Sequence, residues 1–353
     1  MNKEKQPRFV VSVICMSFNH VNFITEAMDG FCMQQTNFPF VCTIIDDAST
    51  DGEQEVIRQY LQEHFELEDK SVVMNEDSDD YVLTFAQHKT NKNCYFAVIY
   101  LKYNHYSIRK SKMPYLKRWA NVKYIALCEG DDYWTASNKL QKQVDFLEAN
   151  PDYGMAYTNH QQYIQKTGEL KNGYSIQTNF NEMLYCNRVC TLTTCFRRKM
   201  WQDYYKEINP ISQQRGWLMG DYPLWLYIMA NSKAKFLPDV TGVYRVLDNS
   251  ASHFTSFNKK IKFIESTYDI CLFFAQSVRI DKSIQKDLAI KEIESLVEIA
   301  AYYHKDIKFP LLSHLYTFHI FSLKKYVSAK MRFSEHGRKI YRKFKSLLLL
   351  RFC

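Results

Sequence analysis

Residues 40–52 read FVCTIIDDASTDG, a short apolar run that ends abruptly in a cluster of aspartates. A second stretch, residues 124–134, reads YIALCEGDDYW and repeats this design. Carboxylates are costly to bury, so acids at the end of a buried strand are expected where a cation or a ligand hydroxyl lies beyond the edge of the sheet. Two such clusters within one alternating pattern of strands and helices indicate a nucleotide site with a divalent metal.

Apolar runs alternate with helical patterns around these two stretches. The run FVVSVICM at residues 9–16 predicts a buried parallel strand, and residues 21–34 carry apolar side chains at helical spacing. Strands are also predicted at 40–45, 71–74, 124–128, 153–160, 188–197 and 235–247, and helices at 53–65, 140–149, 200–205 and 223–229. This order predicts an α/β fold with a mostly parallel, doubly wound sheet that binds ligands at the carboxyl ends of its strands.

From residue 257 to about residue 329 the pattern is helical and contains a single proline, Pro310. A C-terminal helical extension is therefore expected after the α/β domain. We place the boundary after residue 256, which gives an α/β domain at 1–256 and a helical extension at 257–353.

The 353-residue chain is 46% hydrophobic and 24% charged, which is ordinary for a globular protein. Its formal net charge of +8 is concentrated at one end. From Ser322 onward there are ten Lys and Arg residues and a single acid, Glu335. The charge therefore belongs to a tail, and because no nucleic-acid motif accompanies it, nucleic acid is not an expected partner.

The N-terminus does not read as a signal peptide, and no stretch reaches the ~18 apolar residues that suggest a membrane span. Most of the ten cysteines lie in apolar runs, which is typical of reduced, buried cysteine in a cytoplasmic protein. Cys186, Cys190 and Cys195 lie close together but lack the paired spacing of a zinc site.

Three blocks, VSVICMSFNHVNFITEAMDGFCMQQT (11–36), IIDDASTDG (44–52) and YIALCEGDDYW (124–134), resemble a family 2 glycosyltransferase with the GT-A fold. The resemblance covers roughly residues 8–250, and the stretch after the third block is similar to bacterial members that build surface polysaccharides. It implies an inverting hexosyl- or N-acetylhexosaminyltransferase. The donor would be a nucleotide sugar, preferably a UDP-sugar, the acceptor a glycan or lipid-linked hydroxyl, and the cofactor Mn²⁺ or Mg²⁺.

The resemblance assigns the donor's base to the ends of the first two strands. Asp47 would accept a hydrogen bond from the N–H of a uracil ring, which suits an ionised carboxylate. Ser17, Phe18 and Asn19 would line the base, with the aromatic ring against it. The alternative is a turn that caps the following helix, with Asp51 or Ser49 as the capping residue.

The resemblance assigns the metal and the diphosphate to the second cluster and to the end of the matched region. Asp132 would hold the metal and Asp131 the ribose side of the donor. His253 would add a metal ligand, and Arg245 would pair with the diphosphate. The alternatives are a loop of solvated acids, and a His and an Arg with structural roles.

Asp221, in the stretch GWLMGDYP, matches the acid that serves as the general base for the acceptor hydroxyl in this family. A helix that begins at this point would keep the carboxylate ionised, as a base requires. The alternative is an ordinary N-cap aspartate, and one residue can serve both purposes.

Two segments depart from the family pattern. Residues 84–123 contain nine Lys and Arg and no acid. Arg109, Lys110 and Lys112 are therefore expected at the donor diphosphate, at an acceptor that carries a pyrophosphate, or in a solvated loop. The tail from Lys324 to Cys353 mixes cations with apolar residues, which favours an anionic membrane surface on the cytoplasmic side. The alternative for the tail is a helix packed on the enzyme through its leucines, Leu347–Leu350.

Two other functions compete with this interpretation. A sugar-phosphate nucleotidyltransferase has a related sheet but requires a Gly-rich basic signature after the first strand, where this chain has SFNHVNF. A non-catalytic glycan-binding protein would have no need of Asp47, Asp132 and Asp221 together.

Overall fold

The computed structural model describes residues 8–69, 73–247 and 256–303. The chain divides into two compact units. The first comprises Met1–Pro210 and Leu224–Asp248, and the second comprises Ile211–Pro223 and Asn249–Cys353. The domain boundary placed after residue 256 stays a prediction.

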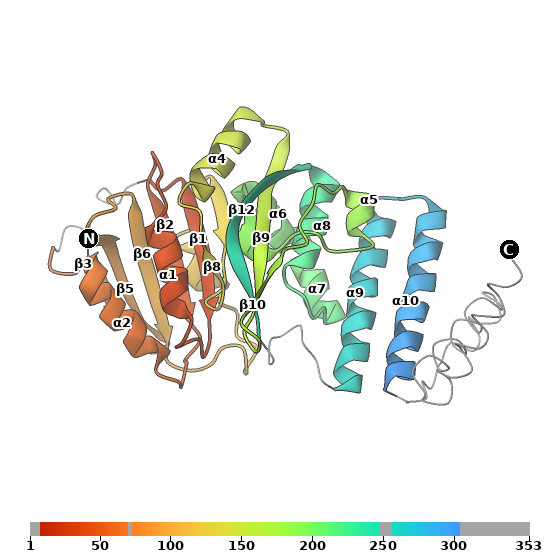
Figure 1. Ribbon diagram of the computed structural model, residues 1–353, viewed down its shortest axis with the longest axis horizontal. Coiled ribbons are helices and arrows are strands. Elements are labelled where there is room, and N and C mark those ends of the chain that lie inside the picture. The colour runs from red at the N-terminus through yellow and green to blue at the C-terminus, as the bar shows by residue number, and fades with distance from the viewer. Residues whose placement is uncertain (1–7, 70–72, 248–255, 304–353) are drawn as a thin grey trace, which may run out of the picture. The chain divides into compact units, whose positions relative to one another are not determined.

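The first unit is built on one mixed sheet with the strand order β3-β5-β6-β2-β1-β7-β11-β9-β12-β8, with β4 beside β5 and β10 beside β9 (Figure 1). The strands are β1 (Val11–Ser17), β2 (Phe40–Asp46), β3 (Phe65–Glu66), β4 (Met74–Asp77), β5 (Tyr81–His88), β6 (Cys94–Leu101), β7 (Tyr124–Leu127), β8 (Tyr133–Trp134), β9 (Tyr153–Ile164), β10 (Glu169–Asn172), β11 (Thr194–Arg197) and β12 (Lys233–Val246). The helices are α1 (Ile24–Cys32), α2 (Glu53–His64), α3 (Met113–Lys117), α4 (Lys139–Ala149), α5 (Phe180–Met183) and α6 (Arg198–Glu207), followed by α7 (Asn209–Arg215) and α8 (Tyr222–Asn231).

The centre of the sheet is parallel. The neighbours β6, β2, β1 and β7 all run in one direction, and α1 and α2 lie next to each other on one of its faces (Figure 1). The continuous apolar runs of these four strands fit a position in the centre of the sheet, because a strand covered on both faces has no solvent side to keep polar. The predicted α/β class is confirmed, and both aspartate clusters follow strands that end at the same edge.

The segment between the two clusters contains more strand than the sequence indicated. A short strand was expected at 71–74, but β4 begins only at Met74, and β5 and β6 were not predicted. All eight residues of β6, CYFAVIYL, are buried, and this strand pairs in parallel with β2. An apolar run of this length without helical spacing is typical of a buried strand.

The strand predicted at 188–197 is shorter in the structure, where β11 begins at Thr194 and a 3₁₀ turn occupies Thr191–Thr193. Both the amide and the hydroxyl of Thr193 donate to the Cys190 carbonyl, at 3.0 and 2.7 Å. Threonine competes in this way with a strand ladder by bonding to nearby backbone, so the β-branched run TLTT was misleading.

In the second unit, α9 (Phe257–Ser277) and α10 (Lys282–Tyr302) pack together, with the Tyr268 and Ser295 hydroxyls 3.1 Å apart. The helical pattern predicted from residue 257 is interrupted between these two helices, where Arg279 has φ +55°. The segment before α8 also belongs here, because Trp217 Nε1 donates to Asp269 at 2.7 Å. Among the residues described, no helix has the length and apolar content needed to cross a membrane.

Lys139, the first residue of α4, provides a pH-dependent test of the fold. It is fully buried, with Nζ 4.2 Å from the centre of the Trp134 ring and 2.9 Å from Gln143 Oε1. Burial lowers its pKa to about 8. Between pH 8 and the ordinary lysine pKa, the unfolded state therefore binds more protons than the folded state, and this residue's contribution to stability rises with pH.

We expect Lys139→Met to stabilise the protein at pH 7, because methionine fills the same volume without a buried charge. The advantage over wild type should be at most about 3 kcal/mol and should shrink between pH 8 and 10.5. Urea unfolding of both proteins across this range measures it. A stability difference that does not change with pH would show that the pKa of Lys139 is not lowered in the folded protein.

Candidate active site

The loop after β7 carries a group of three carboxylates. Glu129, Asp131 and Asp132 each offer a ligand oxygen, and these atoms all lie within 4.8 Å of one another. Asp132 is only 2% exposed. Burial, and then the charges of Asp131 and Glu129, raise the pKa of Asp132 well above its ordinary value. A bound divalent cation would relieve both effects, and oxygen donors of this kind suit Mg²⁺ or Mn²⁺.

The cluster is held close to the end of β1 by its backbone. The Gly130 amide donates to the Met16 carbonyl at 3.0 Å, and the Cys128 amide donates to the Ile14 carbonyl at 3.1 Å. A side chain at Gly130 would overlap the hydroxyl of Ser17 and would bring Cβ within 2.8 Å of Ser17 Cβ. The glycine therefore allows the acidic loop to lie directly against β1.

We expect Gly130→Ala to weaken metal binding, because the added methyl group must push the acidic loop away from the buried Ser17. Overpacking of this kind typically costs ~1–3 kcal/mol of stability. A Mn²⁺ titration followed by electron paramagnetic resonance (EPR), together with thermal melting, checks both effects. Gly220→Ala is a suitable control because Cβ at Gly220 would have nothing within 4 Å. Equal Mn²⁺ affinity in Gly130→Ala and wild type would contradict the prediction.

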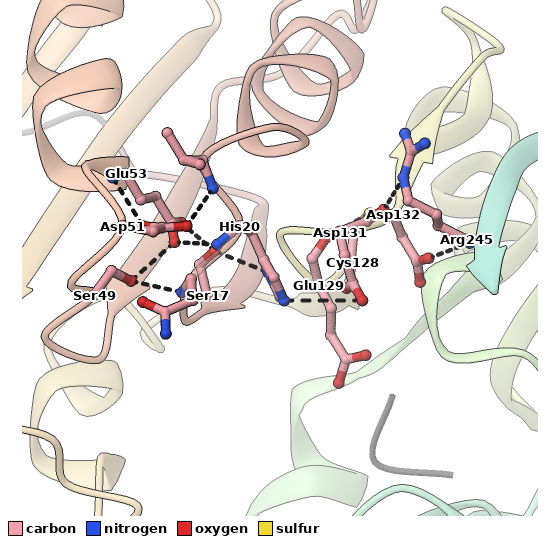
Figure 2. Close-up of polar contacts among 12 residues, drawn as sticks. Ser17, His20, Ser49, Asp51, Glu53, Cys128, Glu129, Asp131, Asp132 and Arg245 are labelled. Carbon is pink, nitrogen blue, oxygen red and sulfur yellow. Dashed lines mark hydrogen bonds and ion pairs between the residues drawn. The ribbon is translucent and has the colours of Figure 1, made fainter. Parts of the chain in front are cut away.

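The loop after β1 is fastened to the loop after β2 by Glu53, the first residue of α2 (Figure 2). This fully buried carboxylate accepts hydrogen bonds from the hydroxyls of Ser17 and Ser49 and from the amide of His20. Beside it, Asp51 accepts from the Val21 amide at 2.9 Å. Burial raises the pKa of Glu53, and the three donors oppose that shift. The loops after β1 and β2 are therefore joined by hydrogen bonds, and we refer to them as the paired loops.

Three of the predicted donor-binding residues lie in the paired loops. Ser17 is buried against Glu53, and Asn19 accepts from the Thr50 amide at 2.8 Å through its side-chain oxygen. Phe18 lies between them and is 43% exposed, which leaves its ring available for stacking. The alternative that made Asp51 or Ser49 the N-cap of the next helix is wrong, because Gly52 takes that position without a side-chain cap. Asp51 Oδ1 nevertheless accepts from the Glu53 amide at 3.0 Å, as in a local turn. The base-binding roles stay predictions.

His20 connects the paired loops to the acidic cluster (Figure 2). Its Nδ1 lies 3.2 Å from the Ser17 hydroxyl, and its Nε2 lies 3.9 Å from an Asp131 carboxylate oxygen. The sequence did not single out His20 or Glu53. Glu53 contacts Ser17 across 36 residues, and His20 contacts Asp131 in the next cluster. Such distant pairs produce no pattern in the local spacing of residues.

Asp47 is buried, and its carboxylate is bound by the chain itself. The amides of His105 and Tyr106 donate to it at 2.7 and 3.1 Å, and Lys112 Nζ lies 2.7 Å from Oδ2. Lys112 thus contacts the proposed base-binding acid, a partner that the sequence did not predict for the basic segment. The role of Asp47 toward uracil stays a prediction.

Three other cations of the basic segment pair with the β4–β5 hairpin. Lys102 and Lys110 lie 2.7 Å from Asp77 and Asp80, and Arg118 lies 2.7 Å from Glu76. These are exposed ion pairs, which water and salt screen, so they contribute little to stability. They neutralise three of the nine cations that the sequence shows between residues 84 and 123.

The remaining predicted residues fall in different places. Arg245, on β12, is buried, and its amide donates to Asp132 Oδ1 at 2.8 Å. Asp221 belongs to the second unit, directly before α8, where its Oδ1 accepts from the Tyr222 amide at 2.7 Å. His253 and the basic tail lie outside the described residues.

No protein-family model matches the chain. The uncharacterized proteins Rv1520 of Mycobacterium tuberculosis and Mb1547 of Mycobacterium bovis are 26% identical over 262 residues, which cover 72% of this chain and 64% of theirs. The alignment thus spans less than two thirds of these relatives. The Escherichia coli UDP-Glc:alpha-D-GlcNAc-diphosphoundecaprenol beta-1,3-glucosyltransferase WfaP is 30% identical over 137 residues, 38% of this chain and 49% of WfaP.

Among solved structures, Staphylococcus aureus TarS 1–349 in complex with UDP-GlcNAc aligns with a TM-score of 0.48 and 12% identity, covering 92% of this chain and 80% of TarS. The mannosyltransferase PcManGT from Pyrobaculum calidifontis, in complex with GDP-Man and Mn²⁺, aligns with a TM-score of 0.48 and 15% identity, covering 96% of this chain and 84% of PcManGT.

Proposed function

We propose that this protein is an inverting glycosyltransferase. It would transfer a hexosyl or N-acetylhexosaminyl group from a nucleotide sugar, preferably a UDP-sugar, to a hydroxyl of a glycan or lipid-linked acceptor in surface polysaccharide synthesis. The observation that carries the proposal is the buried Asp132 within a three-carboxylate cluster at the carboxyl end of a parallel sheet. The sequence similarity to the glucosyltransferase WfaP supports the same class of reaction.

The roles of the residues follow from their chemistry. Asp132, with Glu129 beside it, would hold the divalent cation, which when bound neutralises charge on the departing nucleoside diphosphate. Asp131 would bind the ribose side of the donor. Asp221, in the second unit, is proposed as the base that takes the proton of the acceptor hydroxyl. A single displacement by that hydroxyl at the anomeric carbon inverts its configuration.

Calorimetry of UDP binding with and without Mn²⁺ tests the proposal, followed by a screen of UDP-sugars for slow hydrolysis, which needs no acceptor. We expect Mn²⁺-dependent UDP binding and hydrolysis of one sugar class. Failure to bind any nucleotide in the presence of Mn²⁺ would favour a non-catalytic glycan-binding protein. Release of pyrophosphate from UTP and a sugar 1-phosphate would instead indicate a nucleotidyltransferase.

The tail supports a second proposal, which concerns location. The ten Lys and Arg residues after Ser322 would attract anionic lipid, with about 1 kcal/mol for each cation near the surface. We expect full-length protein to sediment with anionic vesicles at low salt and to be released as salt rises, because salt screens these charges. A chain ending near Lys325 should lose vesicle binding and keep UDP binding. Equal sedimentation of both would refute membrane docking by the tail.

A further inference from the structure

The guanidinium of Arg245 has partners from three different segments of the first unit. Its Nε donates to the Asp131 carbonyl at 2.9 Å, and Nη1 donates to Gln165 Oε1 at 2.9 Å. Nη2 donates to the carboxylate of Glu26, in the first turn of α1. The side chain thus links β12 to the acidic loop, to the end of β9 and to α1.

Aromatic rings surround the same group. The guanidinium carbon lies 4.6 Å from the centre of the Phe23 ring, 5.3 Å from that of Tyr133 and 5.5 Å from that of Tyr163. Cation–π contacts of this kind favour arginine over other side chains, and they add to the hydrogen bonds in fixing its position. Only 5% of Arg245 is exposed, so little of this cation faces solvent, from which a phosphate would approach.

We propose that Arg245 is a positioning residue for the acidic loop, not a ligand of the donor diphosphate, and that Glu26 is the residue that holds it in place. The main chain of Arg245 donates to Asp132 and its side chain donates to the backbone of Asp131. One residue therefore fixes both acids of the loop. This inference rests on the proposed function, since the loop's task is taken to be cation and donor binding.

Substitution of Glu26 distinguishes phosphate binding by Arg245 from loop positioning, because the two roles predict changes of opposite sign in UDP affinity. If Arg245 bound phosphate, Glu26 would compete with the ligand for the same guanidinium, and Glu26→Gln would tighten UDP binding. If Arg245 positions the loop, loss of Glu26 frees the guanidinium to move, and both the cation and the nucleotide bind more weakly. The Glu26 side chain is 53% exposed, so its variants are expected to fold.

The experiment uses the full chain and measures Mn²⁺ affinity by EPR without nucleotide, then UDP and UMP affinity at saturating Mn²⁺. Glu26→Asp and Arg245→Lys keep the charge at each position while they change its reach and, in lysine, the arrangement of its donors. This separates positioning from bulk electrostatics. Glu55→Asp, at an exposed acid in the first turn of α2, is the matched control. Circular dichroism verifies that each variant is folded.

We expect Glu26→Asp and Arg245→Lys each to weaken Mn²⁺ binding about fivefold or more, and Glu55→Asp to leave it unchanged. The double variant should be no worse than the weaker-binding single variant, because residues that act as one unit are not additive. Unchanged Mn²⁺ affinity in Glu26→Asp would overturn the proposal. So would Glu26→Gln binding UDP more tightly, or a loss in Arg245→Lys confined to UDP over UMP. If wild type binds neither Mn²⁺ nor UDP, the proposed function fails instead.

Discussion

Replacement of Asp132 by asparagine is expected to abolish metal-dependent turnover while the fold stays intact. The carboxylate is the buried member of the acidic cluster, and asparagine keeps its shape and its ability to accept from the Arg245 amide. Without the negative charge the cation site loses its central ligand, so sugar transfer or donor hydrolysis should fall at least ~10²-fold. Mn²⁺ titration and rates at saturating donor measure the two losses.

The same substitution should raise the melting temperature of the metal-free protein. Burial and the neighbouring acids raise the pKa of Asp132, which means that the folded state disfavours its charged form at neutral pH. A neutral asparagine removes that penalty. Asp145→Asn, on the exposed side of α4, is the control. Full activity of Asp132→Asn at saturating donor would remove Asp132 from the mechanism.

Asp221→Asn is expected to lower kcat by ~10²-fold or more while UDP affinity stays near that of wild type, because it removes only the proposed proton acceptor. Asparagine is as good as aspartate at a helix N-terminus, so lost capping would not explain the effect. Asp281→Asn supplies a matched control at the start of α10, where Asp281 accepts from the Ser283 amide at 2.6 Å. A variant that binds UDP poorly yet keeps its kcat would make Asp221 a structural residue.

The sequence predicted the features of the site that are local. An apolar strand followed at once by acids is visible in a dozen residues, and both clusters lie at strand ends as expected. The supporting contacts could not be found in this way. Glu53 acts on Ser17 across 36 residues and Glu26 on Arg245 across 219, and nothing in the spacing of residues reports such pairs.

The fold shows the same division between local and distant information. Continuous apolar runs predicted β1, β2 and β7, although the equally apolar run of β6 was not recognised as a strand. Strand β5 was missed because it lies near the sheet edge and is only half-buried. The turn at Thr191–Thr193 was missed because threonine favours strands by propensity and turns by its hydroxyl. Which preference prevails depends on neighbours that the sequence does not identify.

The bond between the Arg245 amide and Asp132, which joins residues 113 positions apart, also has a consequence for biosynthesis. A ribosome releases the acidic loop long before β12 exists, so a nascent chain carries three closely spaced carboxylates without their final donor. The loop can reach its finished geometry only after β12 has joined the sheet. Binding of the proposed cation should therefore follow completion of the whole α/β unit.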